Sequence, residues 1–568
     1  MSESLSKRAL KKILGELPFT AELYFLLRNY EQPSTAKYSL AFLKRALSGW
    51  CTQVERSPFW QGNASQPSAP AGKGLGKKAL IFGEGRFWIE HTTLLGCALA
   101  GLGHEITLAY LPYAYWQTPV ERFDARRNDL YTREVLKPAE RIMRVVSFFD
   151  PKPALISDLS RRSARKTLPA ELEAAVRHVA LRDTQYTLQL ERVELDSSLY
   201  RLRLERNLEA CHIALDYFRA NRPDVVILPN GTILEYGVLY QAAKYLHIPV
   251  VTYEFGEQKQ RIWLAQNAEV MRQETDDLWD ALGGKPLSDA QLAQVRQLFS
   301  ARRGASLWEN FSRRWQGTPN EGGEQVRAAL KLDAGEDGAR RPVVLLATNV
   351  IGDSLTLDRQ VFSSSMTEWI ERTVEYFYRC QQAQLVIRIH PGELVTKGPS
   401  VAEVVIQKIA ALSGAPAGTF PEHIHLIPAD AKINTYDIVE IADLGLVYTT
   451  TVGMEMAMSG LPVIPAGRTH YRSKGFTLDV SSWEEYFDLL NRVIAAPADY
   501  RLTKEQVDQA WNYAYRFFFD YPLPFPWHVL HLQKDVEVTP LEHVWSEAGQ
   551  QTYGKTFRYL MGEPIQWA

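Results

Sequence analysis

The sequence predicts an α/β protein built from two Rossmann-like domains that face each other across a cleft. Short apolar strand segments alternate with helical segments from residue 78 to residue 254, and the alternation restarts near residue 342. Such alternation is typical of parallel sheets covered by helices on both faces. A chain of 568 residues is also too long for one ordinary core. Functional residues are therefore expected beyond the carboxyl ends of the strands.

The composition is that of a folded protein without a general attraction for nucleic acid. The apolar fraction is 46% and the formal net charge is −2. The four cysteines stand far apart without a CxxC motif, as expected of reduced thiols in a reducing compartment. No apolar run is long enough to span a bilayer, and the first 30 residues lack the apolar segment of a secretory signal. We expect a cytoplasmic protein with no nucleic-acid partner.

Residues 1–60 are expected to form a helical appendage, joined to the body by a linker at residues 61–77. Apolar and basic residues alternate over residues 5–14, and residues 36–51 repeat an amphipathic pattern. The linker is rich in Gly, Pro, Ser and Ala. Two interpretations of the appendage stay open: it docks on the body, or its basic face contacts an anionic membrane surface.

The first Rossmann-like domain is assigned to residues 78–330. Its opening strand ends in "GEG", but the third glycine of a dinucleotide fingerprint is missing, so a tight turn is the favoured interpretation. The strand in "VVTYEFGE" ends at Glu254, with Glu257 three residues later. A carboxylate beside a dry cleft has a raised pKa and can act as a general base. Glu254 is the predicted base, Glu257 the reserve and Glu84 a weaker candidate; a loop salt bridge is the alternative.

The second Rossmann-like domain is assigned to residues 331–500, and residues 501–568 to a C-terminal helical tail. One of its predicted strands, in "VIRIHPGE", ends in a charged turn. A histidine in that turn can donate to phosphate or ribose oxygens, or it can simply cap the turn. The turn supplies four candidate ligand residues: Arg388, His390, Pro391 and Glu393.

A cluster of threonines follows the strand in "LGLVYTTTVG" and precedes a short helix. Hydroxyl groups together with backbone N–H groups at a helix start can hold an anion, whereas ordinary N-capping needs only one hydroxyl. Within the helix, Glu455 can accept from a ribose or sugar hydroxyl, or face solvent. The candidate residues are Thr449, Thr450, Thr451, Gly453 and Glu455.

A cationic loop, "GRTHYRSKGF", follows the next strand. Its place in the chain puts it near the same anion site, so we interpret it as a partly mobile clamp on a diphosphate, a carboxylate or an acceptor. A solvated loop is the alternative. The candidate residues are Arg468, Tyr471 and Lys474.

Over residues 342–490 the chain resembles the bacterial capsule polysaccharide synthesis family, which includes the Kdo transferases. The resemblance rests on "TNVIGDS", "RIHPGE", "INTYDIVEIADLGLVYTTTVGMEMAMSGLPVI" and "GRTHYRSKGFTLD", and it is faint in the first domain. The His-Pro pair and the hydroxyl cluster also resemble those of bacterial sialyltransferases, where they hold the nucleotide and phosphate of a CMP-sugar. The resemblance implies a GT-B fold and an inverting, metal-independent glycosyltransferase. It implies donor-site roles for His390, Pro391 and Thr449–Thr451, and the polar turn in "TNVIGDS" adds Asn349, Asp353 and Ser354.

These observations predict a glycosyltransferase of surface-polysaccharide assembly that takes a nucleotide-sugar donor and a glycan or glycolipid acceptor. No cofactor is expected, and the absence of DxD and HExxH motifs predicts no metal. CMP-Kdo or a CMP-sialic-acid-like sugar is the donor that the resemblance favours, with UDP and GDP sugars open.

In the family, an acidic-acidic-glycine stretch holds the catalytic acid; here Phe255 stands in the second acidic place. A UDP-sugar 2-epimerase, a polyol-phosphate transferase and a non-catalytic binder stay as alternatives. The predicted location is the cytoplasm, with the inner face of the cell membrane as the site of any membrane contact.

Overall fold

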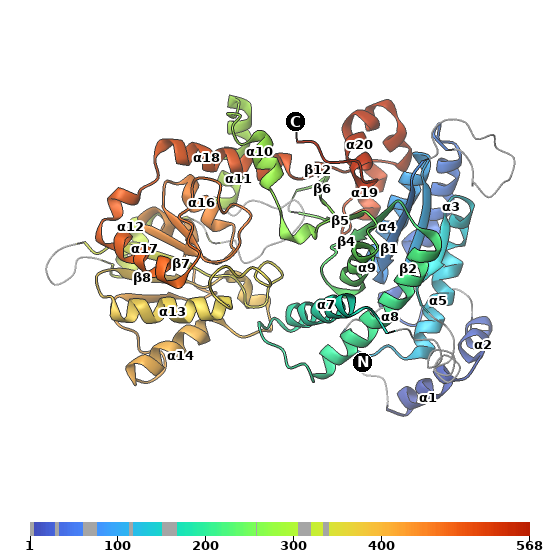
Figure 1. The fold of residues 1–568 in the computed structure, drawn as a ribbon, viewed down its shortest axis with the longest axis horizontal. Helices are drawn as coiled ribbons and strands as arrows, with labels where there is room; N and C mark the ends of the chain where they lie inside the picture. The colour runs from blue at the N-terminus through green and yellow to red at the C-terminus, as the bar shows by residue number, and fades with distance from the viewer. Residues whose placement is uncertain are drawn as a thin grey trace. The chain divides into compact units, whose positions relative to one another are not determined.

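The computed structural model describes residues 5–28, 33–60, 76–112, 117–149, 167–256, 258–304, 318, 320–332 and 340–567. The chain forms two compact units, each with its own sheet (Figure 1). Unit 1 comprises Met1–Thr184, Glu194–Met271 and Pro522–Gln566, and unit 2 comprises Gln185–Val193, Arg272–Tyr521 and Trp567–Ala568. The predicted α/β class with two Rossmann-like, parallel-sheet domains, as GT-B proteins have, is confirmed.

Unit 1 holds a seven-stranded sheet in the order β12-β6-β5-β4-β1-β2-β3. The five strands from β5 to β3 run parallel, whereas β6 is antiparallel to β5 and β12 is antiparallel to β6. The strands are β1 (Lys78–Glu84), β2 (Glu105–Leu111), β3 (Arg144–Ser147), β4 (Val225–Pro229), β5 (Val250–Glu254), β6 (Arg261–Gln266) and β12 (Leu523–Pro524). Our sequence analysis did not predict β3, β6 or β12.

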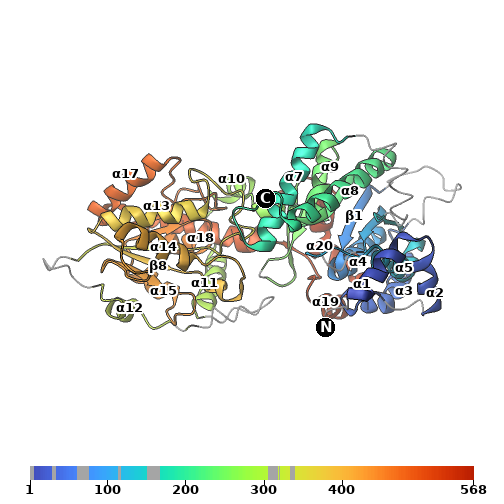
Figure 2. The ribbon, with the colours of Figure 1, turned by 90° about the horizontal axis from the view of Figure 1, so that it is seen from below.

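Helices cover both faces of this sheet because successive strand side chains point to opposite sides. Ala79 and Ile81 of β1 face one core, whereas Leu80 and Phe82 face the other. Figure 2 shows α7, α8 and α9 on one side of β1 and α3 and α4 on the other. The helices are α1 (Leu5–Glu16), α2 (Thr20–Leu27), α3 (Ala41–Glu55), α4 (Gly85–Gly101), α5 (Arg122–Leu136), α7 (Ala170–Leu188), α8 (Ser198–Asn221), α9 (Leu234–Tyr245), α19 (Leu532–Val538) and α20 (Glu547–Leu560).

Unit 2 holds a five-stranded parallel sheet in the order β11-β10-β7-β8-β9. Its strands are β7 (Val343–Ala347), β8 (Gln384–Arg388), β9 (Ile424–Ile427), β10 (Leu444–Val447) and β11 (Val463–Pro465). One core lies between the sheet and α13, α14 and α17, and a second lies against α12, α15 and α16. The helices are α10 (Asp276–Leu282), α11 (Asp289–Arg303), α12 (Gly323–Ala329), α13 (Met366–Arg379), α14 (Val401–Ser413), α15 (Thr435–Ile441), α16 (Val452–Met458), α17 (Trp483–Ala495) and α18 (Lys504–Tyr515).

The boundaries of the two units differ from those expected. The main segment of unit 2 begins at Arg272 rather than at residue 331, because Phe299 of α11 packs against aromatic residues of α18 and of the π-helical turn that follows it. The expected tail is divided: residues up to Tyr521 belong to unit 2, and Pro522–Gln566 returns to complete the core of unit 1. Residues 61–75 of the expected linker lie outside the described ranges.

The N-terminal region is an integral part of unit 1 rather than an appendage. Helix α3 places Leu43, Leu47, Trp50, Cys51 and Val54 in the main core of the unit. Ahead of α3, the Tyr38 and Thr132 hydroxyls are 3.0 Å apart. The docking interpretation is therefore correct for α3.

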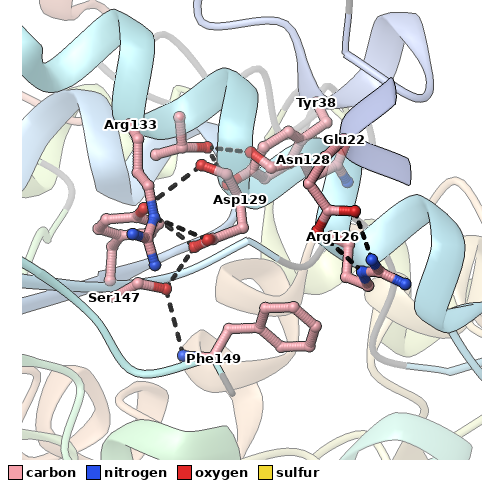
Figure 3. A network of polar contacts seen from close by, with 10 residues as sticks. Glu22, Tyr38, Arg126, Asn128, Asp129, Arg133, Ser147 and Phe149 are labelled. Carbon is pink, nitrogen blue, oxygen red and sulfur yellow. Dashed lines mark hydrogen bonds and ion pairs between the residues drawn. The ribbon is translucent and has the colours of Figure 1, made fainter. Parts of the chain in front are cut away.

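Helices α1 and α2 dock on helix α5 (Figure 3). Arg126 donates to both carboxylate oxygens of Glu22 in α2, and its Nε–Oε1 distance is 3.1 Å. On the side of α5 toward β3, Asp129 accepts from Arg133 and from the Ser147 hydroxyl. Polar contacts thus fix α5 between the N-terminal helices and the sheet.

In the part of the chain that the structure describes, no helix combines the length and the apolar character needed to cross a membrane.

Leu47→Ala should lower the free energy of unfolding of unit 1 by about 2–5 kcal/mol, because it deletes a fully buried side chain from the main core. Ile13→Ala is the control, since Ile13 is 62% exposed and its truncation should change stability by less than about 0.5 kcal/mol. Urea unfolding followed by circular dichroism measures both. If both substitutions changed the free energy of unfolding by the same small amount, α3 would not be part of the core of unit 1.

Candidate functional site

The strand order of unit 2 indicates at which edge of the sheet a ligand would bind. From β7 the chain adds β8 and β9 on one side, then crosses to add β10 and β11 on the other. The order therefore reverses between β7 and β10, and ligands of open parallel sheets bind beyond the carboxyl ends at such a reversal. Three predicted polar segments follow β7, β8 and β10, and the parallel pairing brings them to the same edge.

Asn349 joins the two strand ends at the reversal. Its Oδ1 accepts from the backbone N–H of Thr449 at 3.1 Å, and both residues are 7% exposed. The Thr449 Oγ1 is buried and has no hydrogen-bond partner among the described residues. A buried hydroxyl without a partner costs about 1–3 kcal/mol unless something else satisfies it. The Arg388 Nε at the end of β8 is likewise without a partner in the described part of the chain, so this edge holds polar atoms that a ligand or a water molecule would satisfy.

The rest of the threonine cluster is held from the cationic loop. The Tyr471 hydroxyl donates to the Thr450 carbonyl at 2.7 Å. Gly453 has to be glycine, because a Cβ there would lie 2.3 Å from the Tyr471 hydroxyl. Thr451 precedes α16 in a helical conformation and makes no side-chain capping bond, so N-capping does not explain the cluster. Since α16 has only seven residues, hydroxyl groups rather than a long helix dipole characterise this edge.

Glu455 does not face solvent, which was one of its two interpretations. It is 3% exposed, accepts from Arg302 of α11 at 3.0 Å, and also accepts from the Tyr436 hydroxyl. An ion pair with a hydrogen-bonded tyrosine satisfies a buried carboxylate without any ligand. A role for Glu455 toward ribose stays a prediction.

His390 caps the turn after β8, as the alternative interpretation had it. Its Nδ1 accepts from the Gly392 N–H at 3.0 Å, and its own backbone N–H donates to Thr348 Oγ1 at 3.0 Å. An imidazole that accepts at Nδ1 carries its proton on Nε2 and can donate there. Pro391 opens the 3-10 turn Pro391–Val395. Capping and ligand binding are therefore compatible for His390.

The two charged neighbours of His390 are engaged by the protein itself. Arg388 is buried and donates to the Pro428 carbonyl, and burial lowers its pKa to about 10. Glu393 accepts from the Val401 N–H at 3.0 Å and from the Ser400 hydroxyl at 2.9 Å, which fixes the start of α14. A ligand role for either residue stays a prediction.

Beyond β7, Ser354 donates from its hydroxyl to the carboxylate of Asp353 at 3.3 Å. Burial raises the pKa of Asp353. The hydrogen bonds that Asp353 accepts from Ser354 and from backbone N–H groups only partly oppose this rise. Asp353 is thus a half-buried carboxyl group at the edge where β7 ends, with its neutral form favoured by burial.

The cationic loop is tethered, with one exposed cation among the three predicted ligand residues. The Arg468 side chain is exposed, whereas the Tyr471 side chain is fully buried. Lys474 is 5% exposed and forms an ion pair with Asp276. His470 stacks on Phe517 with ring centroids 3.8 Å apart, and burial lowers its pKa to about 3, so it is neutral near pH 7. The sequence could not indicate these tethers, because Asp276 and Phe517 lie far away in the chain.

In unit 1, Glu254 ends β5 and is held by its surroundings. Its Oε1 accepts from the Phe255 N–H at 3.0 Å, and its Oε2 accepts from Asn230 Nδ2 at 3.3 Å. Burial raises the pKa of Glu254, and these two hydrogen bonds only partly lower it. No salt bridge to Glu254 occurs among the described residues. Glu257 lies outside the described residues.

Within the described ranges, no group of three or more His, Cys, Asp or Glu side chains is arranged to hold a metal ion.

Comparisons with known proteins give distant likenesses only. No family model and no curated protein matches the chain. Among solved structures, the KpsC beta Kdo 2,4 transferase of Thermosulfurimonas dismutans is similar at 14% identity, over 54% of this chain and 83% of that one, with a TM-score of 0.31. A UDP-GlcNAc 2-epimerase from Neisseria meningitidis, bound to UDP-GlcNAc, is similar at 12% identity, over 78% and 99%, with a TM-score of 0.25. At these values the likenesses decide nothing about substrate, and the α/β class rests on the sheets themselves.

The free energy of unfolding of the Glu254→Gln variant should increase relative to that of the wild type as the pH rises from about 4 toward neutrality. Because burial raises the pKa of Glu254, the native state binds its proton more tightly than the unfolded state does. The resulting stability is fully present below the unfolded-state pKa and is lost as the pH rises through the native pKa. Glutamine cannot ionise, so the variant does not lose stability in this way as the pH rises.

Urea unfolding of both proteins across this pH range measures the difference, with the exposed Glu542→Gln as the control. A stability difference that does not change with pH would show that Glu254 ionises as freely as a carboxyl group in water.

Proposed function

We propose that this chain is a metal-independent, inverting glycosyltransferase that uses a nucleotide-activated sugar in capsule or surface polysaccharide assembly. The observation that carries the proposal is the buried, unpartnered Thr449 hydroxyl beside Asn349, at the strand reversal of unit 2. His390 follows the neighbouring strand and has a ring nitrogen that can donate. The sequence resemblance to capsule polysaccharide synthesis proteins gives these same residues a donor-site role.

In the proposed complex, the Thr449 hydroxyl and the His390 Nε2–H hydrogen-bond to phosphate or ribose oxygens of the nucleotide. The exposed Arg468 is the cation of the loop best suited to meet the phosphate charge. Lys474 would have to leave Asp276 before it could take part. The donor sugar is a CMP-Kdo-like or CMP-sialic-acid-like residue, as the resemblance favours.

Glu254 is the proposed general base. The acceptor hydroxyl oxygen forms a bond to the anomeric carbon, the bond from that carbon to the phosphate oxygen breaks, and the nucleotide leaves with both electrons. The proton of the hydroxyl passes to the Glu254 carboxylate. A pKa raised by burial brings the group nearer to neutrality, where a base is most effective.

Thr449→Val and His390→Ala should each weaken nucleotide binding by about 1.5–3 kcal/mol, the usual cost of a lost hydrogen bond to a charged group. Isothermal titration with CMP, UMP, UDP, GDP and CDP measures the affinity. Thr449→Val should not lower the free energy of unfolding, because the hydroxyl has no hydrogen-bond partner in the described part of the chain. Thr419→Val is the matched control, since Thr419 is exposed and precedes β9 at the opposite edge of the sheet.

Wild-type affinity in both variants would contradict the donor-site assignment. Turnover with the nucleotide-sugar that binds, with and without a mixed glycan acceptor and in the presence of EDTA, then separates the functions. Transfer that survives EDTA supports the proposal. Conversion of the sugar without acceptor indicates an epimerase, and binding without turnover indicates a non-catalytic protein.

We also propose that the first two helices contact a lipid surface, through an apolar face rather than the basic face expected from the sequence. Arg8 and Lys11 of α1 form ion pairs with Glu121 and Asp124, so these two basic side chains point at the body of unit 1. Large apolar side chains are left exposed. They are Leu10, Ile13, Leu17, Phe19, Leu23, Leu26 and Leu27, which are 45–77% exposed.

Sedimentation with anionic lipid vesicles tests this contact. The wild type should sediment with them, and high salt should release little, because burial of apolar side chains is not screened. The double variant Leu23→Asp/Leu27→Asp should stay in solution, whereas Val538→Asp, at an exposed position of α19, should behave as the wild type. Release by salt together with binding by the double variant would instead favour a basic contact.

A further inference from the structure

Unit 1 has its own strand reversal, and a cluster of charged side chains is buried there. From β1 the chain adds β2 and β3 on one side and β4 and β5 on the other, so the order reverses between β1 and β4. Glu84 ends β1, and Glu235 lies in the first turn of α9, the helix that follows β4. Tyr236 holds Glu84 in place through its hydroxyl, which lies 3.0 Å from the Glu84 N–H.

Arg203 of α8 is the centre of the cluster. It donates to Asp183 of α7 and, at 3.2 Å, to Glu235, and all three side chains are at most 1% exposed. Arg206 of the same helix is 8% exposed and donates to the Thr118 carbonyl at 2.8 Å. Four elements of unit 1 thus converge on one buried group of charges.

Glu84 and Glu235 do not carry the same charge. Burial and the neighbouring Glu235 raise the pKa of Glu84 well above its usual range. Arg203 holds the pKa of Glu235 below its usual value in spite of burial. Glu84 thus favours its neutral form and hydrogen-bonds to Glu235, while the Asp183 and Glu235 carboxylates both pair with Arg203.

Some buried polar atoms of this cluster have no hydrogen-bond partner among the residues that the structure describes. Asn207 is fully buried with both its amide oxygen and its amide nitrogen unpartnered, and it lies one turn from Arg203, on the same face of α8. A dry site would leave each such atom without the hydrogen bonds that it makes in water, which is unfavourable. Asp183 Oδ1 and Thr232 Oγ1 also lack a partner among the described residues, whereas the Glu84 and Glu235 carboxyl groups hydrogen-bond to each other.

We propose that this cluster is a binding site for a neutral, hydroxyl-rich group such as a sugar ring. The unpartnered atoms are two acceptors (Asn207 Oδ1 and Asp183 Oδ1), one donor (Asn207 Nδ2) and the Thr232 hydroxyl, which can do both, so the ligand has to bring donors as well as acceptors. An anion is disfavoured because the carboxylates already neutralise Arg203. Hydroxyl groups both donate and accept, which matches the mixture of atoms. As the site of an acceptor sugar this rests on the function proposed above; as a sugar site it stands alone.

Saturation-transfer NMR of the full chain tests the site, with a mixture of the methyl glycosides of glucose, galactose, mannose and N-acetylglucosamine as the probe. At least one glycoside should receive saturation from the wild type and from Glu205→Gln, an exposed change on α8. Asn207→Leu should lose the signal while its melting temperature stays equal or rises, because the amide makes no bond that leucine could remove. Thr232→Val should reduce the signal in the same way, because the Thr232 hydroxyl also lacks a partner among the described residues.

No saturation of any glycoside by the wild type, or an unchanged signal in both Asn207→Leu and Thr232→Val, would overturn the proposal. A fall in the melting temperature of Asn207→Leu without a change in signal would mark a purely structural role and overturn it too. Nucleotide titration of the same samples keeps the two proposals apart. Glycoside binding without nucleotide binding would contradict the proposed glycosyltransferase function but support the proposed sugar site.

Discussion

Parallel, in-register strand pairing is the constraint on which both candidate sites depend. In unit 2, Ala347 pairs with Arg388 on one side and with Val447 on the other. Residues that follow these positions leave the sheet at the same level, which is why Asn349 reaches Thr449 and Thr348 reaches the backbone of His390. A shift of one residue in either pair would turn these side chains to the other face of the sheet. The relative positions of the site residues therefore depend on the strand register.

Burial sorts the polar residues of this protein into two kinds. Glu455 and Lys474 look like ligand residues in the sequence, yet each forms an ion pair within the protein. Arg388 donates to a carbonyl, and its Nε has no partner among the described residues. Thr449 and Asn207 are neutral, yet each is buried with a polar atom that no described residue satisfies. A charge near a strand end is thus weaker support for a ligand than a neutral group without a partner.

Much of the fold and the edge of the site could be predicted from the sequence. The strand-helix alternation located nearly all the parallel strands, and the polar residues that follow them lie where predicted because parallel strands end at a common edge. Strands β3 and β12 were missed because they are short and lie at the edges of the sheet. Strand β6 has six residues with alternating burial, so its pattern could have been predicted. The partners of Glu455 and Lys474 could not be predicted, because Arg302 and Asp276 lie more than 150 positions away in the chain. The Arg203 cluster was missed because its members come from four separate elements.

The return of the chain to unit 1 has a consequence for the order in which the protein can be made. Strand β12 pairs with β6, and residues after it complete the main core, although unit 2 is translated in between. Unit 2 therefore leaves the ribosome nearly whole while the sheet of unit 1 still lacks its last strand. Until residues 522–566 emerge, β6 has an unpaired edge and the core of unit 1 is uncovered, which is the state in which nascent chains associate wrongly. Pro524, which cannot donate a backbone hydrogen bond, ends the completed sheet against further strand addition. Chaperone demand during synthesis should accordingly fall on the half of the molecule that is translated first.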